Sequence, residues 1–330
     1  MRINFLLPTV SLAGGIRVVA IYAKWLSDRG HTVSLISPPE RSISLKRKVG
    51  SFVRGRGWPI TSSRKPSHID GLGLDHRVLD TWRAPMNSDV PPGDVLVATW
   101  WETAEWAYAL DSSKGAKAYF VQGYEIFPYL PLERVHATYR LPMHKITVAR
   151  WLANVMRDQY GDACCDVVPN SVDKLQFFSG QRVKQVRPTV GFLYSEMQLK
   201  GVDVSLSVVR HLREKWPNMR VVCFGSHSPS LNRLNEEGIE FHLSPRQDFI
   251  KDIYTQCDVW LSTSRSEGFN LTAMEAMACR TPVVSTRTGW PEEVINDGLN
   301  GYLVDIDDVE AAACCIDKIF RLSADAWSLL

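Results

Sequence analysis

The sequence lacks several signatures that would assign a chain of 330 residues quickly. It has no Walker A motif and no G-x-G-x-x-G after a predicted strand, which argues against an NTPase or a dinucleotide-dependent enzyme. No apolar stretch approaches the roughly 18 residues that a membrane span needs, and the apolar start is too short for a signal peptide. The 7 cysteines show no C-x-x-C spacing and the 8 histidines no metal-ligand spacing, so neither a zinc site nor a disulfide framework is expected. A net charge of +2 indicates no partnership with nucleic acid.

The chain does have a regular alternation of short apolar runs and longer amphipathic runs, which is typical of βαβ units. The predicted strands are 3–7, 32–37, 94–99, 116–122, 145–148, 166–168, 189–194, 220–225, 239–243, 258–262, 282–285 and 301–304. The predicted helices are 16–29, 151–160, 201–215, 247–256, 271–279 and 307–320. We therefore expect an α/β protein of two doubly wound domains, 1–170 and 171–330, divided at a turn-rich segment.

A basic segment interrupts the first half. Residues 41–69 hold eight lysines or arginines and no acid, with Phe52 and Trp58 among them. One interpretation is a long solvated insertion. The other is a basic loop with aromatic tips that meets anionic lipid or a phosphate-bearing acceptor.

Doubly wound domains bind ligands beyond the carboxyl ends of their strands, where helices begin. Glu267 and Glu275 lie around such a helix start, with Asn270 as the predicted N-cap. Amides at the helix start suit an anion, and carboxylates accept hydrogen bonds from sugar hydroxyls. An anion flanked by sugar rings describes a nucleoside-diphosphate sugar. The alternative, that both glutamates only favour the helix dipole, explains Glu267 better than Glu275. A second helix start, at Gly14 and Gly15, is equally consistent with a tight turn that binds nothing.

The run from Cys257 to Ser285 resembles the donor site of glycosyltransferase family four, whose E-x-x-x-x-x-x-x-E motif falls on Glu267 and Glu275. Residues 291–301, 169–177, 191–201, 14–15 and 119–125 continue the resemblance, and the last of these is similar to polysaccharide rhamnosyl- and hexosyltransferases. The resemblance implies a GT-B fold of two Rossmann-like domains. Residues 1–170 would form the acceptor side and residues 171–330 the nucleotide-sugar side. The family's C-terminal crossover helix is expected to be missing from a chain that ends at Leu330.

The same resemblance implies a retaining glycosyltransferase that uses neither metal nor another cofactor. It would move a sugar from a nucleoside-diphosphate-sugar donor to a saccharide or lipid-linked acceptor, in the synthesis of surface polysaccharide or a glycoconjugate. Glu267 would contact the donor sugar, Glu275 the ribose and Lys200 the diphosphate. Further donor contacts would come from Gly14, Gly15, Gly268, Phe269, Asn270 and Leu271, and acceptor-side contacts from Gln122, Tyr124 and Glu125. We expect a cytoplasmic protein, either free or peripheral at the inner face of the membrane through residues 41–69.

Three positions depart from the family pattern. Phe192 stands where many relatives have an arginine, Lys200 lies further along the chain than usual, and Gln122 stands where many have a histidine. These departures leave two alternatives open. One is another GT-B enzyme, such as a nucleotide-sugar epimerase or a phosphorylase, and the other is a catalytically impaired sugar-nucleotide-binding protein.

Two other patterns have a simpler interpretation beside the functional one. Asp305 and Asp307 form a D-x-D, which we assign to a loop and a helix cap rather than to a metal site. Trp100, Trp101 and Trp106 either line a cleft between the domains or pack around the helix after strand 94–99.

Overall fold

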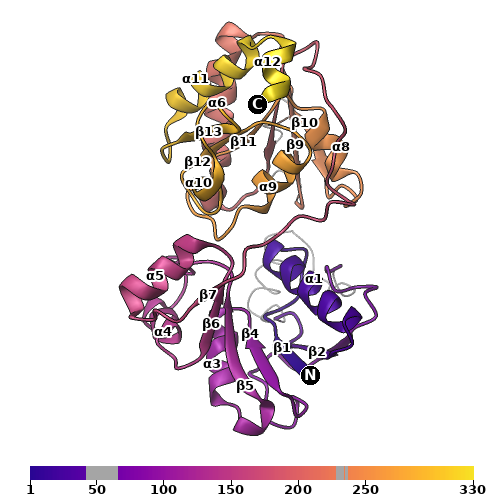
Figure 1. Ribbon diagram of the computed structural model, residues 1–330, viewed down its shortest axis with the longest axis vertical. Helices are drawn as coiled ribbons and strands as arrows, with labels where there is room; N and C mark the ends of the chain where they lie inside the picture. Colours follow the sequence, from indigo (N-terminus) through magenta and orange to yellow (C-terminus); the bar gives the residue numbers. More distant parts are fainter. Residues whose placement is uncertain (42–65, 228–233, 235–236) are drawn as a thin grey trace, which may run out of the picture. The chain divides into compact units, whose positions relative to one another are not determined.

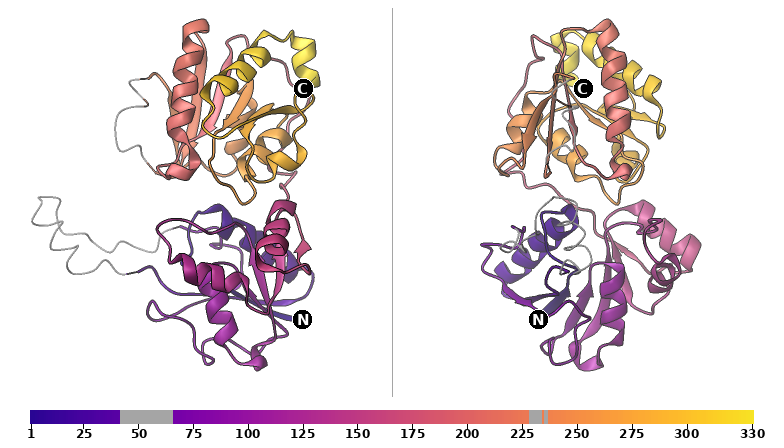
Figure 2. Two further views of the ribbon diagram at one scale, coloured as in Figure 1. Left: turned by 90° about the vertical axis from the view of Figure 1, so that its left-hand side faces the viewer. Right: turned by 180° about the vertical axis from the view of Figure 1, so that it is seen from behind.

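The computed structural model describes residues 1–41, 66–227, 234 and 237–330, and it divides into two compact units. The first unit is Met1–Val148 with Leu152–Val168, and the second is Ala149–Trp151 with Pro169–Leu330. Each unit is a parallel sheet with helices on both faces (Figure 1; Figure 2). This is the predicted pair of Rossmann-like α/β units. Residues 42–65 of the basic segment lie outside the described residues.

In the described part of the first unit, seven parallel strands run in the order β3-β2-β1-β4-β5-β6-β7. Their bounds are β1 (Arg2–Leu6), β2 (Thr32–Ser37), β3 (Asp75–Val78), β4 (Val95–Ala98), β5 (Ala116–Val121), β6 (His144–Thr147) and β7 (Asp166–Val167). The helices are α1 (Gly14–Asp28), α3 (Trp101–Ala109), α4 (Leu132–Tyr139) and α5 (Arg150–Tyr160). Strand residues alternate between the two faces: Tyr119 packs in a core with α3 and α4, whereas Phe120 meets Tyr22 of α1 edge to face at 5.5 Å.

The described residues of the second unit form a six-stranded parallel sheet of order β10-β9-β8-β11-β12-β13. The strands are β8 (Thr189–Leu193), β9 (Arg220–Gly225), β10 (Glu240–Leu243), β11 (Val259–Ser262), β12 (Val283–Thr286) and β13 (Gly301–Val304). The helices are α6 (Val202–Lys215), α8 (Ile250–Thr255), α9 (Leu271–Ala278), α10 (Pro291–Val294), α11 (Val309–Arg321) and α12 (Ala324–Leu329). Along β9, Val221 and Cys223 join the core under α6 and α11, while Val222 and Phe224 join the core under α8 and α9. Both faces of the strand are therefore apolar, as in a doubly wound sheet.

The structure corrects some predicted boundaries and adds elements. Strand β3 was not predicted, because Asp75–Val78 is a polar, largely exposed edge strand with no apolar alternation. Helix α4 was not predicted either, since it is short and follows a proline-rich turn. The predicted helix 307–320 begins at Val309, because Asp308 rather than Asp307 is its N-cap and accepts a hydrogen bond from the Ala311 amide at 2.8 Å. Among the described residues, no helix combines the length and apolar character needed to cross a membrane.

The three tryptophans near α3 pack in the first unit. Trp101 is buried in the core, and Trp100 and Trp106 pack against the same cluster. Trp106 also meets Trp82 edge to face at 6.3 Å. Packing, rather than the lining of a cleft, therefore accounts for Trp101.

Candidate functional site

The second unit has a topological switch point between β8 and β11. These two strands are neighbours, but β9 follows β8 on one side of the pair and β12 follows β11 on the other. The loops that leave their carboxyl ends therefore diverge and leave a crevice, which is where doubly wound sheets bind ligands. A 3-10 turn (Gln198–Lys200) lies on the loop after β8, and residues 263–270 form the loop after β11.

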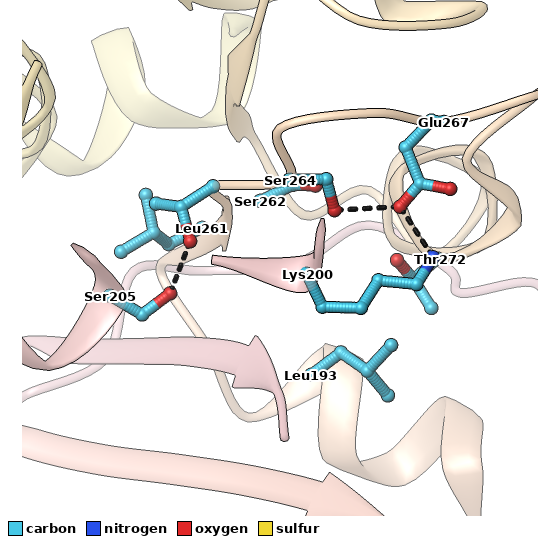
Figure 3. Close-up of a pocket in the computed structure, with 9 residues that line it drawn as sticks. Leu193, Lys200, Ser205, Leu261, Ser262, Ser264, Glu267 and Thr272 are labelled. Atoms are coloured by element: carbon cyan, nitrogen blue, oxygen red, sulfur yellow. Dashed lines mark hydrogen bonds and ion pairs between the residues drawn. The ribbon is translucent and has the colours of Figure 1, made fainter. Parts of the chain in front are cut away.

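Lys200 and Glu267 come from these two loops and meet in the crevice. The Lys200 ammonium donates to Glu267 Oε1 at 2.7 Å, and the Ser264 hydroxyl donates to the same oxygen at 2.6 Å. Figure 3 shows both side chains pointing at the carboxylate. The Lys200 side chain is 27% exposed and that of Glu267 11%, so the pair lies partly shielded from water. The pocket is lined by Leu193, Lys200, Ser205, Leu261, Ser262, Thr263, Ser264, Glu267 and Thr272.

Helix α9 opens beside this pocket with an unusual cap. The Asn270 side chain accepts from the Ala273 amide at 3.3 Å, which confirms the predicted N-cap, and it donates to the Ser262 hydroxyl at 2.8 Å. Asn270 has φ 79° and ψ 68°, a left-handed conformation that asparagine tolerates better than most residues. The helix therefore starts sharply at Leu271, and the next residue, Thr272, lines the pocket.

The cap allows a stability prediction. We expect Asn270→Ala to lower the free energy of unfolding by roughly 1.5–4 kcal/mol, since it loses the cap and strains the left-handed backbone. Asn270→Gly loses the same side chain but relieves the backbone, so it should cost less than the alanine variant. Denaturant unfolding of the two variants checks this order, and equal losses would show that the backbone conformation contributes nothing.

Arg265 ties the two loops together, although the sequence did not mark it as a site residue. Its guanidinium donates to the Gln198 carbonyl at 2.8 Å and to both carboxylate oxygens of Asp203 at 3.0 and 2.7 Å. Its backbone amide donates to the Leu199 carbonyl at 2.8 Å. The guanidinium holds the pKa of the Asp203 carboxyl below its usual range. The turn that carries Lys200 is thus fixed to the loop that carries Glu267.

Packing against Trp290 holds Phe269, another of the predicted donor residues. Phe269 is buried and stacks on Trp290 with ring centroids 5.4 Å apart, while the Trp290 amide donates to the Phe269 carbonyl at 2.9 Å. Gly268 lies half-buried between Glu267 and Phe269, and Leu271 is the first residue of α9. Phe269 thus anchors this loop by packing within the second unit.

Glu275 sits deeper than Glu267. Its side chain lies in the second turn of α9, only 4% of the residue is exposed, and Oε2 accepts from the buried Tyr254 hydroxyl at 2.8 Å. The structure therefore places the two glutamates of the motif in different surroundings: Glu267 lines the pocket, whereas Glu275 is buried against Tyr254.

Phe192, the departure from the family pattern after Gly191, lies in the hydrophobic core and is fully buried. The next residue along β8, Leu193, is the one that lines the pocket. A β carbon on Gly191 would stand 2.6 Å from Cys257 Sγ and 2.7 Å from the Trp260 ring, so close packing requires the glycine. Among the described residues that line this pocket, Lys200 supplies the cationic side chain.

The first unit brings together Gly14, Gly15 and Gln122. The two glycines are the first residues of α1, and the Gln122 amide atoms lie 3.6 Å from where a β carbon of Gly15 would stand. Gln122 Nε2 donates weakly to the Thr99 carbonyl at 3.5 Å, and within the described residues its Oε1 is buried without a hydrogen-bond partner.

Glu125, one of the predicted acceptor-side residues, lies buried in the first unit. It is 3% exposed, and its Oε2 accepts from the Trp101 amide at the start of α3 at 2.9 Å. Burial raises the pKa of this carboxyl well above its usual range. The nearby Tyr124 is partly exposed, but its hydroxyl bonds Gln159 at 2.5 Å and Tyr160 at 2.9 Å. Glu125 therefore supports the fold from inside the first unit.

No group of three or more histidine, cysteine, aspartate or glutamate side chains suited to a metal occurs in the part of the chain that the structure describes. The two aspartates of the D-x-D bond arginines instead. Asp305 pairs with Arg287 at 3.4 Å, and Asp307 pairs with Arg265 at 2.7 Å.

Comparison with known proteins finds a family model that is similar to most of the second unit. Residues 187–321 match the family described as "Glycosyl transferases group 1". A D-inositol 3-phosphate glycosyltransferase of Corynebacterium urealyticum is 33% identical over 144 residues, which is 39% of this chain and 34% of that protein. The chain thus spans about a third of the length of this relative. A protein of the same name from Acidothermus cellulolyticus is 26% identical over 364 residues, covering 95% of this chain and 79% of its own.

Solved structures share the fold of this protein over nearly its whole length. Anabaena HepE, in complex with UDP and glucose, superposes with a TM-score of 0.73 at 15% identity, covering 100% of this chain and 92% of its own. WaaG, described as a glycosyltransferase of lipopolysaccharide biosynthesis, gives a TM-score of 0.68 at 15% identity, covering 99% and 93%. The fold is therefore GT-B, and residues 187–321 match the family model of group 1 glycosyltransferases.

Proposed function

We propose that the protein is a retaining glycosyltransferase that takes a sugar from a nucleoside-diphosphate donor and attaches it to a saccharide or lipid-linked acceptor. The observation that carries this proposal is the meeting of Lys200 and Glu267 at the switch point of the second unit. A cation and a carboxylate side by side can serve a diphosphate and the hydroxyls of the sugar attached to it. The start of α9 adds amides that suit the same anion.

The proposed reaction follows the pattern that the family resemblance implies. The acceptor oxygen bonds the anomeric carbon on the face from which the diphosphate leaves, and a leaving phosphate oxygen takes the acceptor proton. Lys200 stabilises the charge that develops on the diphosphate, and Glu267 orients the sugar. Glu275 serves the ribose in this proposal, either directly or by supporting the start of α9.

Two sources support the choice of ligands to test. Neighbouring structures hold UDP with glucose or UDP-glucose, and several relatives are named for D-inositol 3-phosphate. A donor panel should therefore contain UDP-, GDP- and dTDP-sugars. The acceptor panel should contain D-inositol 3-phosphate besides saccharides and lipid-linked saccharides.

The test has two stages. Thermal shift of the full chain with each donor identifies the nucleotide, and transfer is then measured against each acceptor, with the anomeric configuration of the product read by NMR. Transfer with retained configuration is expected. Inverted configuration, release of an epimerised donor, or phosphate-dependent cleavage of the acceptor would each replace the proposal with another activity. Binding without turnover on any acceptor would favour the sugar-nucleotide-binding alternative.

We further propose that the reaction needs no divalent metal. Lys200 and the start of α9 supply the positive charge for the diphosphate, and the arginine partners of Asp305 and Asp307 compete with a cation. Transfer activity should therefore persist in excess EDTA, at a rate within about twofold of the untreated enzyme. Loss of activity that returns with Mg²⁺ or Mn²⁺ would contradict this expectation.

A further inference from the structure

Lys200 and Glu267 are proposed to hold different parts of the donor, yet in the structure they hold each other. The Lys200 ammonium lies 2.7 Å from Glu267 Oε1. A diphosphate that engages Lys200 must share this ammonium or draw it away from the carboxylate. Donor binding therefore changes the partner of Glu267 as well as that of Lys200.

The exchange is unfavourable for Glu267 unless something replaces the ammonium. Its side chain is 11% exposed, so water compensates poorly for the lost cation. The Ser264 hydroxyl, at 2.6 Å, stays in place but carries no charge. A partly buried carboxylate that loses its cation and gains no donor is destabilised.

A sugar changes this balance. Hydroxyl groups of a sugar attached to the diphosphate can donate to Glu267 and compensate for the lost ammonium. A nucleoside diphosphate without its sugar offers no such donors. The sugar nucleotide and the sugar-free nucleotide both engage Lys200. Only the sugar nucleotide has hydroxyl groups that can compensate Glu267 for the lost ammonium.

We infer that Glu267 makes this site selective for a nucleoside diphosphate that still carries its sugar, and that it weakens binding of the sugar-free product. This rests on the proposed function. Glu267 thereby acts as a specificity-determining residue that favours release of the spent nucleotide. The selectivity arises because the diphosphate and Glu267 compete for the Lys200 ammonium.

The test is Glu267→Gln, which keeps the shape and removes the charge. The probes are UDP, GDP or dTDP, whichever shifts the wild-type melting temperature most, and the sugar nucleotide with the same base. By calorimetry, the sugar-free nucleotide should bind the variant about 3- to 10-fold more tightly, on the scale of one ordinary net hydrogen bond. The sugar nucleotide should gain less affinity or lose affinity. The preference of the site for the sugar nucleotide over the sugar-free nucleotide should therefore fall.

Three comparisons isolate the cause. Glu310→Gln removes the same charge from the exposed first turn of α11 and should change neither affinity. Ser264→Ala leaves the ion pair and should not strengthen binding of the sugar-free nucleotide. In a Lys200→Ala background, Glu267→Gln should give no gain, because the gain comes from the freed ammonium. Should Glu267→Gln fail to fold, Glu267→Ala tests the same gain.

The outcomes separate this inference from the proposed function. No binding of any nucleotide or sugar nucleotide to the wild type would overturn both. Lys200-dependent binding of the wild type, with no tighter product binding in the glutamine variant, would overturn this inference alone. An equal gain for both ligands would also overturn it, since general charge removal would then explain the result.

Discussion

Replacing Lys200 with alanine is expected to weaken binding of the nucleoside diphosphate by roughly 1.5–3 kcal/mol, or about 10- to 150-fold. The ammonium lines the pocket at the carboxyl ends of β8 and β11, beside the start of α9. A nucleoside monophosphate lacks the second phosphate, so its affinity should fall much less. Calorimetry with the mono- and diphosphate of the same base measures the difference.

A matched lysine provides the control for this prediction. Lys215 ends α6 in the same unit, is 56% exposed, and lies 4.0 Å from Asp317. Lys215→Ala removes an equal charge away from the pocket and should leave both affinities unchanged. If Lys200→Ala weakened mono- and diphosphate binding by the same factor, Lys200 would not sit at the second phosphate.

The layers of both units could be predicted because the chain repeats a simple pattern. Buried parallel strands are apolar on both faces, and β9 shows this in four consecutive residues, Val221–Phe224. Strand β3 escaped prediction because an exposed edge strand has no apolar face to bury. The start of α9 was located at its capping residue Asn270, whereas the start of α11 was predicted two residues early although Asp308 caps it.

The candidate site was predictable in its position but not in all its members. Glu267 and Asn270 stand out because they follow a buried strand, where parallel sheets bind ligands. Arg265 stands in the same stretch, but its role depends on Asp203 and Gln198, which are far away in the sequence. Only the folded chain brings these partners together.

The direction in which a side chain points could not be predicted from its place in the sequence. Glu125 follows Gln122 closely in sequence, yet its carboxylate turns inward to the start of α3. Phe192 and Leu193 show the same effect on a strand. Leu193 lines the pocket, whereas Phe192 lies in the core. Adjacent strand residues point to opposite faces, so an error of one position in aligning a motif changes the inferred role.

Gly201→Val is expected to destabilise the second unit by roughly 2–5 kcal/mol, the sum of backbone strain and overpacking. Gly201 has φ 61°, a left-handed conformation that a β-branched residue rarely adopts. An added β carbon would also stand 2.0 Å from the Thr263 carbonyl oxygen, so the backbone must move. That movement carries Lys200, the preceding residue, away from Glu267, and the folded fraction should lose nucleotide binding as well.

Gly180→Val is the matched control, because Gly180 is exposed, its φ is not left-handed, and no described atom lies within 4 Å of its added β carbon. It should leave both stability and nucleotide binding near wild-type values. Denaturant unfolding measures the first quantity. Hydrogen exchange locates the change, which should appear in α6 and β11 while α1 and β1 of the first unit keep their protection. The contrary result is that Gly201→Val unfolds like the wild type and still binds the nucleotide. That result would show that the close approach of Gly201 to Thr263 is not needed to hold Lys200 in the candidate site.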